Sequence, residues 1–117
     1  MKKLKNLYKG SGAETLAINF LKKNKFKILE RNFRAVTGEI DIIALKNDVY
    51  HIIEVKSSDN LNFGYPKERV TKDKIWKIKN TTQCYFLKNK KIIDDYYLSF
   101  DIIEIIGDKL EFFENAF

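Results

Sequence analysis

The stretch Gly38-Glu39-Ile40-Asp41-Ile42-Ile43, together with Glu54-Val55-Lys56 a little further on, decides the fold of this chain. Both stretches have the apolar pattern of β-strands, and both contain acidic side chains. Side chains two residues apart in a strand point to the same face, so Glu54 and Lys56 project together. If the two strands pair as a hairpin, Asp41 lies beside them. Two carboxylates and one lysine in that arrangement suit metal-assisted cleavage of phosphodiesters, because the acids hold Mg²⁺ and the amine positions or activates water.

These charged residues also have an ordinary structural interpretation. An Asp in an isoleucine-rich strand is disfavoured by strand propensity, yet it can cap a turn or face solvent on an edge strand. Glu54 and Lys56 can form the exposed face of an amphipathic strand. An E-x-K triplet alone is a weak signal. Its combination with an acid-bearing partner strand favours the functional interpretation.

The hydrophobic pattern predicts the element order α-β-β-β-α-β-β. The expected helices span residues 13–24 and 67–87, and the expected strands span 26–34, 39–45, 49–56, 96–106 and 109–114. A mixed sheet with a helix on each face accommodates this order. The length of 117 residues is typical of one domain, so we expect residues 1–117 to fold as a unit, with residues 1–12 as a flexible basic N-terminus.

Each expected helix carries one charged residue within its apolar face. At about 100° per residue, Glu14 falls between Ile18 and Leu21, and Lys74 falls close to Ile78. A carboxylate aimed toward a core is costly unless a metal or a cation meets it. Either side chain could instead snorkel from the rim, which is the usual explanation for a lysine. Because both helices would flank the same sheet, each could offer its charged group to that sheet.

The chain carries 22 basic and 16 acidic residues, a net charge of +6. Residues 1–34 and 66–91 hold 10 and 9 basic residues, with 2 acidic residues each, whereas residues 35–65 hold 5 acidic and 2 basic residues. Two basic segments thus flank an acidic centre, as expected for polyanion binding around a metal site. A solvated lysine-rich surface is the competing interpretation.

Several classes of protein are disfavoured by the composition. No stretch approaches the ~20 apolar residues of a membrane span, and no apolar segment follows the N-terminal lysines as in a signal peptide. Cys84 is the single cysteine, so neither an internal disulfide nor a cysteine-based zinc site is expected. These features predict a cytoplasmic protein that does not act at a membrane.

Three other side chains could carry chemistry. His51, the single histidine, is an odd number of residues from Glu54, so we expect it to face away from the acids and to be structural. A histidine mechanism and a Cys84 nucleophile therefore have little support. Trp76 falls on the side of the second helix opposite Lys74, where it can stack on a nucleic-acid base or form a dimer contact.

Together these motifs resemble the YraN-like family of small bacterial proteins, which are predicted nucleases. That family is related to archaeal Holliday-junction resolvases within the PD-(D/E)xK, restriction-endonuclease-like superfamily. The matching stretches span most of the chain in the family's order: Gly12-Ala13-Glu14 with Ala17 and Leu21, Leu29-Glu30-Arg31-Asn32-Phe33-Arg34, Gly38-Glu39-Ile40-Asp41-Ile42-Ile43-Ala44, Glu54-Val55-Lys56, Phe63-Gly64, Val70 through Lys74, and Phe100-Asp101-Ile102-Ile103. The resemblance implies a restriction-endonuclease-like, three-layer α/β/α sandwich around a central mixed sheet.

The resemblance also implies roles for individual residues. Asp41 and Glu54 would hold Mg²⁺ or Mn²⁺, with the Val55 carbonyl as a further oxygen ligand. Lys56 would be the catalytic lysine. Glu14 would complete the acidic cluster from the first helix, directly or through water.

One position departs from the family pattern. Family members usually follow the lysine with Thr-Arg, whereas this chain has Ser57-Ser58. A cation beside the site is therefore missing, and phosphate binding there would be weaker or supplied by Lys67 or Arg69. The expected nucleic-acid contacts are Arg31, Arg34, Lys67, Arg69, Lys72 and Lys74, the last as an accessory basic residue of the second helix.

The sequence thus predicts a metal-dependent endonuclease acting on DNA rather than RNA, with branched or otherwise structured DNA as a candidate substrate. One alternative is a catalytically weak or inactive nucleic-acid-binding module on the same scaffold, which the Ser57-Ser58 departure favours. Another is an interaction domain that uses Trp76 and the aromatic C-terminus. A homodimer would suit branched DNA, since two sites could cut two strands.

Overall fold

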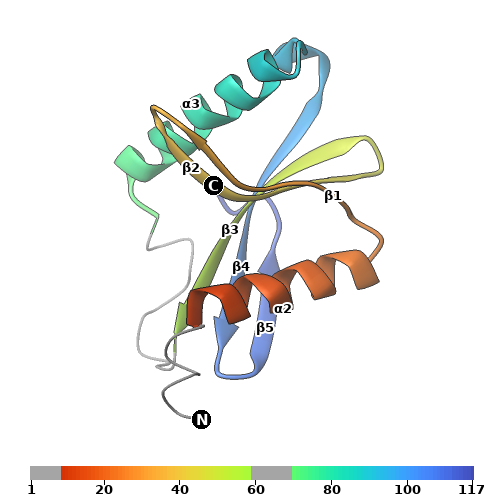
Figure 1. The fold of residues 1–117 in the computed structure, drawn as a ribbon, viewed down its shortest axis with the longest axis vertical. Coiled ribbons are helices and arrows are strands. Elements are labelled where there is room, and N and C mark those ends of the chain that lie inside the picture. The colour runs from red at the N-terminus through yellow and green to blue at the C-terminus, as the bar shows by residue number, and fades with distance from the viewer. Residues whose placement is uncertain (1–8, 59–69) are drawn as a thin grey trace.

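The computed structural model describes residues 9–58 and 70–117, with side chains from residue 12 onward. The elements follow the predicted order, with one short 3₁₀ helix added before β4 (Figure 1). They are α2 (Lys9–Lys23), β1 (Lys27–Ala35), β2 (Gly38–Lys46), β3 (Val49–Ser58), α3 (Lys72–Lys88), η2 (Ile93–Asp95), β4 (Tyr97–Ile106) and β5 (Lys109–Phe113). The predicted α/β class is confirmed, with a five-stranded sheet. None of the helices in these ranges is long and apolar enough to cross a membrane. The basic residues 1–8 and the Phe63-Gly64 motif lie outside the described residues.

Strands β1, β2 and β3 form an antiparallel meander. Asn47 and Asp48 make the turn between β2 and β3, with φ values of 50° and 64°. Two consecutive residues with positive φ are typical of a type I′ turn, whose twist matches that of the flanking strands. Asn and Asp adopt this conformation more readily than most residues. The turn lies between the expected strands 39–45 and 49–56.

Strands β3 and β4 are parallel, and α3 lies in the connection between them, as a parallel crossover requires. Their register runs without a shift from Val49↔Tyr97 to Ser58↔Ile106. Strand β5 returns antiparallel to β4, so the sheet is mixed and its order is β1-β2-β3-β4-β5. The predicted mixed sheet is confirmed. The parallel pairing places β4 directly beside the strand that carries Glu54.

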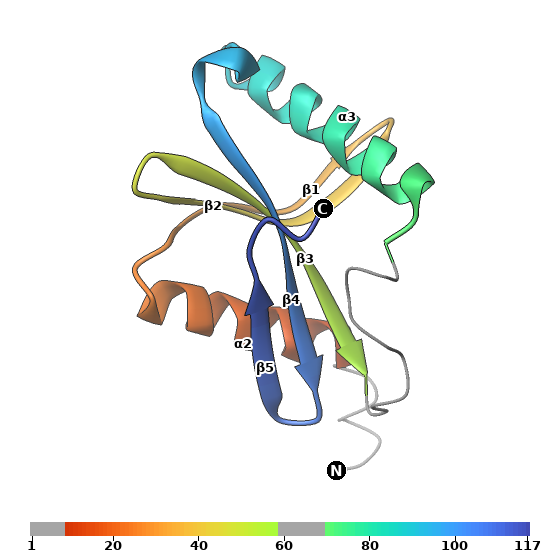
Figure 2. The same ribbon diagram turned by 180° about the vertical axis from the view of Figure 1, so that it is seen from behind.

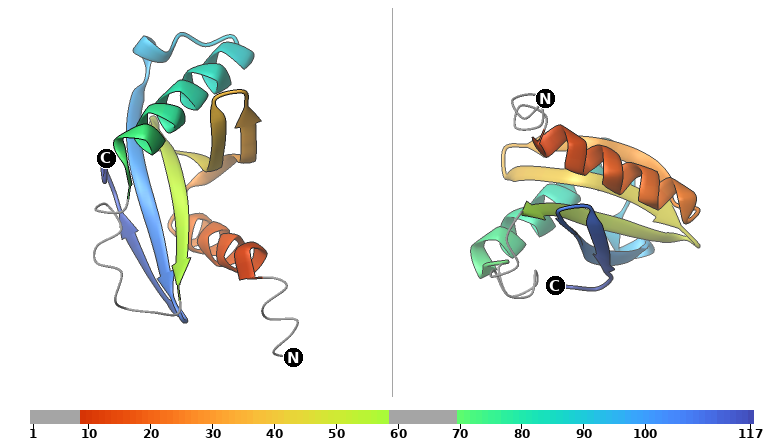
Figure 3. Two further views of the ribbon diagram at one scale, coloured as in Figure 1. Left: turned by 90° about the vertical axis from the view of Figure 1, so that its left-hand side faces the viewer. Right: turned by 90° about the horizontal axis from the view of Figure 1, so that it is seen from below.

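The sheet lies between the two helices (Figure 2; Figure 3, right). On one face, α2 packs Ala13, Ala17, Ile18 and Leu21 against Ile42, Ala44, Ile53, Ile103 and Ile105. On the other face, α3 packs Ile78, Tyr85 and Phe86 against Phe33, Ile40, Ile43, Tyr50 and Ile52. The consecutive residues Ile52 and Ile53 are both fully buried, one in each cluster, as a strand covered on both faces requires. The prediction of one helix on each face is therefore confirmed.

Two helix boundaries differ from the prediction. Helix α2 begins at Lys9, so residues 10–12 are helical rather than an irregular N-terminal segment. Residues 70 and 71 are not helical, so a continuous helix from residue 67 is wrong. Thr71 is the N-cap of α3, and its side-chain oxygen accepts a hydrogen bond from the Lys74 backbone N–H at 3.1 Å. A threonine at this position satisfies one of the N–H groups that the first helical turn leaves unpaired.

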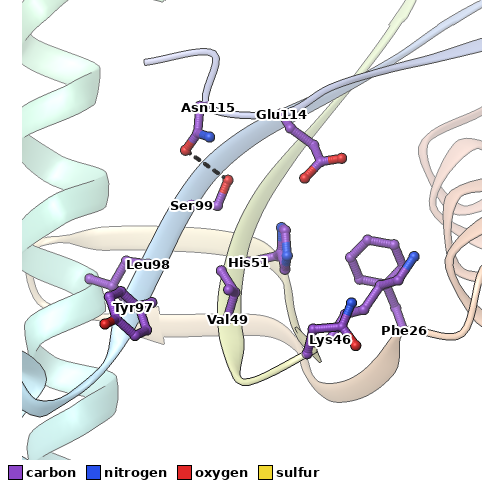
Figure 4. A pocket seen from close by; sticks show the side chains of 10 residues that line it. Phe26, Lys46, Val49, His51, Tyr97, Leu98, Ser99, Glu114 and Asn115 are labelled. Atoms are coloured by element: carbon purple, nitrogen blue, oxygen red, sulfur yellow. Dashed lines mark hydrogen bonds between the residues drawn. The ribbon is translucent and has the colours of Figure 1, made fainter.

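A buried polar cluster lies on the α2 face of β3 and β4 (Figure 4). The Asp101 carboxyl lies 2.6 Å from Nδ1 of His51, and it also accepts hydrogen bonds from Ser99 Oγ at 2.5 Å and the Asn115 backbone N–H at 3.0 Å. The His51 ring packs edge-on against Phe26, with centroids 4.9 Å apart. His51, Ser99 and Asn115 also line a cavity of about 450 Å³. His51 thus lies on the opposite face of β3 from Glu54, as predicted from their spacing.

Candidate functional site

The candidate site lies where β2 and β3 separate. Their paired segment ends at Ile42↔Ile53, although both strands continue beyond it. Asp41 and Glu54 are the first residues beyond the pairing on each strand. The β1–β2 hairpin bends away from β3 and β4 at this level (Figure 3, left). Side chains of the two strands can therefore occupy the space that a hydrogen-bonded ladder would otherwise close.

Asp41 bridges part of this gap. Its Oδ2 accepts a hydrogen bond from the Val55 backbone N–H at 2.8 Å. The Asp41 side chain thus satisfies a backbone donor of β3 beyond the paired part of β2. The pKa of Asp41 is nevertheless raised from its ordinary value of 3.8 to about 6. Burial is the largest cause, followed by the negative charge of Glu54, with smaller contributions from Glu14 and Glu39. These three acids therefore lie close enough to oppose the ionisation of Asp41.

Glu54 projects toward α3 and is 4% exposed. Its Oε1 forms an ion pair with Nζ of Lys74 at a distance of 3.1 Å. Its Oε2 is buried and has no hydrogen-bond partner among the residues that the structure describes. An unpartnered carboxylate oxygen in a buried position is costly, so it indicates a place where a cation or a ligand donor would be stabilised.

Two lysines from different elements meet beside these acids. Burial lowers the pKa of Lys56, and the hydrogen bond and positive charge of Lys74 lower it further. Burial also acts to lower the pKa of Lys74, but its contacts with the Lys56 amine and with Glu54 raise the pKa overall. The two shifts therefore have opposite directions. Lys56 is the amine that becomes neutral more readily, which is the state that can accept a proton from water.

Helix α2 contributes Glu14, which is half-buried. When the Asn32 amide is oriented with its nitrogen toward this carboxylate, Nδ2 donates to Oε1 at 2.9 Å and to Oε2 at 3.2 Å. Asn32 has a φ of 52°, a left-handed conformation that asparagine tolerates. The negative charge of Glu14 also raises the pKa of Asp41, so Glu14 belongs to the same acidic group. Asn32 was not among the predicted site residues, although an Asn inside an expected strand was the available signal.

A cleft of about 480 Å³ opens onto Asp41, Glu54 and Lys74. It is lined by Gly38, Glu39, Asp41, Glu54, Asp73, Lys74, Lys77 and Ile78, from β2, β3 and α3. The hairpin that carries Asp41 is held against α3, because Thr37 Oγ1 and Thr81 Oγ1 form a hydrogen bond of 2.8 Å. Within ranges 9–58 and 70–117, no three His, Cys, Asp or Glu side chains gather closely enough to hold a metal ion by themselves. The site as it stands combines two neighbouring carboxylates with two lysines.

The predicted nucleic-acid contacts have different surroundings. Three of them are exposed side chains: Arg31, Arg34 and Lys72. Arg34 is paired, since its Nε lies 3.0 Å from Oε2 of Glu39. Lys74 differs, because its ammonium lies inside the acidic site. Lys67 and Arg69 lie outside the described residues.

Glu104 is a buried acid that the sequence analysis did not single out. It is the register partner of Lys56 on β4, so its side chain leaves the sheet on the same side as that lysine. The sequence does contain a hint of this position, because Glu104 interrupts the apolar run 102–106 just as Asp41 interrupts an isoleucine-rich strand. Its position beside Lys56 depends on the parallel register, which the hydrophobic pattern does not reveal.

We expect Asp41→Asn to stabilise the metal-free protein at pH 8 and to have little effect at pH 4. The pKa of about 6 in the folded state exceeds the ordinary value of 3.8, so the folded state binds this proton more tightly than the unfolded chain. Ionisation therefore destabilises the fold above pH 6, and this penalty disappears below about pH 4. Asparagine retains an oxygen for the Val55 N–H. The gain at pH 8 should be at most about 3 kcal/mol, measured by urea unfolding in EDTA.

Asp73→Asn is the matched control for this measurement, because Asp73 is an exposed acid that lines the same cleft. It forms an ion pair with Lys77 on the helix surface, so its removal should bring no gain at either pH. A gain for Asp41→Asn that is as large at pH 4 as at pH 8 would contradict the assigned cause.

Comparison with known proteins gives a consistent family. A model described as "Uncharacterised protein family UPF0102" matches residues 13–105. A UPF0102 protein of Persephonella marina is 41% identical over 109 residues, covering 93% of this chain and 92% of the relative. A UPF0102 protein of Clostridium perfringens is 47% identical over 96 residues (82% and 77% covered), and one of Aliarcobacter butzleri is 44% identical over 108 residues (92% and 94% covered). This chain therefore belongs to UPF0102, an uncharacterised protein family.

Proposed function

We propose that this protein is a Mg²⁺- or Mn²⁺-dependent endonuclease that hydrolyses phosphodiester bonds in DNA. The observation that carries the proposal is the meeting of Asp41, Glu54 and Lys56 where β2 and β3 separate, with one buried oxygen of Glu54 left without a partner. The motifs that resemble restriction-endonuclease-like proteins support the same activity. A small α/β structure with a helix on each face of a mixed sheet is compatible with that fold.

The donor atoms at the site fit a hard divalent cation. Asp41 and Glu54 supply carboxylate oxygens. Burial and nearby acids disfavour the ionised form of Asp41, and a bound cation would favour it. Mg²⁺ is usually bound by one or two carboxylates, with water and substrate phosphate completing its coordination. The absence of three gathered ligands in the described residues is therefore compatible with this ion. The Val55 carbonyl would be a further oxygen ligand, and Glu14 would contribute directly or through water.

Different residues of the chain would have different roles in hydrolysis. A bound divalent ion supplies charge that stabilises the phosphoryl oxygens and makes water a better nucleophile. Lys56, the amine with the lowered pKa, would position that water and accept its proton. Lys74 keeps its proton and holds one oxygen of Glu54, which fixes the orientation of that carboxylate. Exposed cations such as Arg31 and Lys72 would neutralise flanking phosphates, so DNA affinity should fall with salt.

The proposal is tested with linear, circular and four-way-junction DNA in Mn²⁺ or Mg²⁺, with Asp41→Asn and an EDTA reaction as controls. We expect cleavage by the natural protein and none in either control. The junction substrate separates a preference for branched DNA from general nuclease activity. Full cleavage by Asp41→Asn would show that the activity resides elsewhere.

Metal binding has a readout that does not depend on catalysis. We expect Mn²⁺ to raise the unfolding temperature of the natural protein at pH 8, because a ligand that binds the folded state stabilises it by mass action. Asp41→Asn should lose most of this response. An equal response in both proteins would place the ion at another site.

A catalytically inactive nucleic-acid-binding module is the second candidate. The Glu54–Lys74 ion pair favours it, because the ammonium already neutralises one carboxylate that a metal would need. Ser57-Ser58, which lacks the family's cation, favours it as well. This candidate predicts salt-sensitive DNA binding without turnover in either metal.

A further inference from the structure

The outer face of α3 carries an aromatic side chain that the proposed chemistry does not use. Trp76 is 59% exposed, and Lys72, Lys79 and Gln83 around it are exposed too. Residues spaced by three or four positions share one side of a helix, so these four side chains form a single row. We call Lys72, Trp76 and Lys79 the Trp76 ridge. An exposed indole presents a flat aromatic face on which a partner of matching shape can stack.

The surroundings of Trp76 do not match a protein-binding surface. The cores of protein interfaces are enriched in aromatic residues but depleted in lysine. Trp76 instead has lysines four residues before it and three residues after it. Among the described residues of α3, the other large exposed apolar side chain is Leu87, eleven positions away and thus about 16 Å along the helix. Within the described part of α3, the indole therefore has no large apolar neighbour on the exposed side.

The charge of α3 matches a polyanion. The helix contains five lysines and one aspartate, and that aspartate, Asp73, is paired with Lys77 at 3.2 Å. Nζ of Lys79 lies 5.3 Å from the centroid of the Phe100 ring, which holds this cation beside the ridge. An aromatic face between cations is the arrangement that single-stranded nucleic acids recognise, through base stacking and phosphate contacts. In a duplex the base faces are buried in the stack, so a tryptophan on a helix surface cannot reach them.

We propose that the Trp76 ridge binds a single-stranded segment of nucleic acid, with one unpaired base stacked on Trp76. Lys72 and Lys79 take the flanking phosphates. Asp73 and Lys77 of the same helix line the cleft beside the acidic site, so a strand leaving the cleft can continue onto the ridge. This inference relies on the proposed function for the class of ligand, but it requires no cleavage.

The single tryptophan makes the test direct, because all indole fluorescence comes from Trp76. A fluorescein-labelled oligothymidylate and a duplex of equal length are titrated in EDTA, and both label anisotropy and indole emission are measured. We expect the oligothymidylate to quench the indole. We expect Trp76→Ala to weaken oligothymidylate binding at least about fivefold, since stacking of one base contributes roughly 1–3 kcal/mol. Duplex affinity should change less than twofold, and Trp76→Phe should retain part of the single-strand affinity.

Two controls separate this inference from its rivals. Leu87→Ala removes an exposed apolar side chain of the same helix away from the ridge, so it should bind like the natural protein. The second control is the cleavage assay of the natural protein, because quenching without cleavage in Mn²⁺ or Mg²⁺ would overturn the proposed nuclease and leave the ridge intact. The proposed binding of single strands would be overturned if oligothymidylate failed to bind, or if it bound saturably without quenching the indole. It would also be overturned if Trp76→Ala weakened single-strand and duplex binding equally, or if that variant abolished a dimer.

Discussion

Lys56→Ala is expected to lower the rate of metal-dependent DNA cleavage at least about a hundredfold, while DNA affinity changes less than about threefold. A positioned general base contributes roughly 10²–10⁴ to rate, and Lys56 is the amine whose pKa is lowered by burial and by Lys74. Its ammonium is half-buried beside two acids, so it contributes little to the exposed charge that attracts DNA. Single-turnover cleavage and anisotropy binding, measured on the same DNA, separate these two effects.

Lys77→Ala is the matched control, because it truncates a lysine that lines the cleft beside Asp41 and Glu54. Lys77 is exposed and paired with Asp73 rather than with the acids, so its loss should change cleavage less than about threefold. Asp41→Asn should lose cleavage as completely as Lys56→Ala. Equal cleavage by the natural protein and by both site variants, in Mg²⁺ or Mn²⁺, would refute the assigned roles.

Local pattern was sufficient to predict the strands that carry the site. The alternation of Glu54 and Lys56 along β3, and the Asn47-Asp48 turn that joins β3 to β2, are short-range properties of a strand and a tight turn. The helical period likewise identified Lys74 as a charged group on the buried side of α3, and the ion pair with Glu54 accounts for its presence there. These features share one cause: each depends on residues fewer than about ten positions apart, or on one face of one element.

Features that depend on distant segments could not be predicted in this way. The separation of β2 from β3 beyond Ile42↔Ile53 follows from how the hairpin packs on α3, through contacts such as Thr37 with Thr81. The position of Glu104 beside Lys56 follows from the parallel register of β4. The start of α3 was mispredicted for a different reason: the helix begins after the Thr71 N-cap rather than at residue 67. The pattern thus identified most charged residues of the site, but not the gap that allows them to meet.

The His51–Asp101 cluster shows how strongly the parallel pairing matters for stability. The two residues are 50 positions apart and meet because His51↔Ser99 and Ile53↔Asp101 are partners in the register of β3 and β4. Asp101 is fully buried and receives three donors, from a strand neighbour, a side chain on β3 and the segment after β5. Removing one partner of such a network leaves the others buried without acceptors, which costs more than the network contributed.

Asp101→Ala is therefore expected to destabilise the protein by roughly 3–5 kcal/mol, a large part of the stability of a domain this size. Urea unfolding measures the loss, and Asp94→Ala, which removes an exposed acid close to β4, should change stability by less than about 0.5 kcal/mol. Because the chain has one histidine, NMR gives a second readout. The Nδ1 proton of His51 should be protected from exchange in the natural protein and lost in Asp101→Ala. Stability within about 1 kcal/mol of the natural protein would show that water satisfies these donors, and that the cluster does not hold β3 and β4 together.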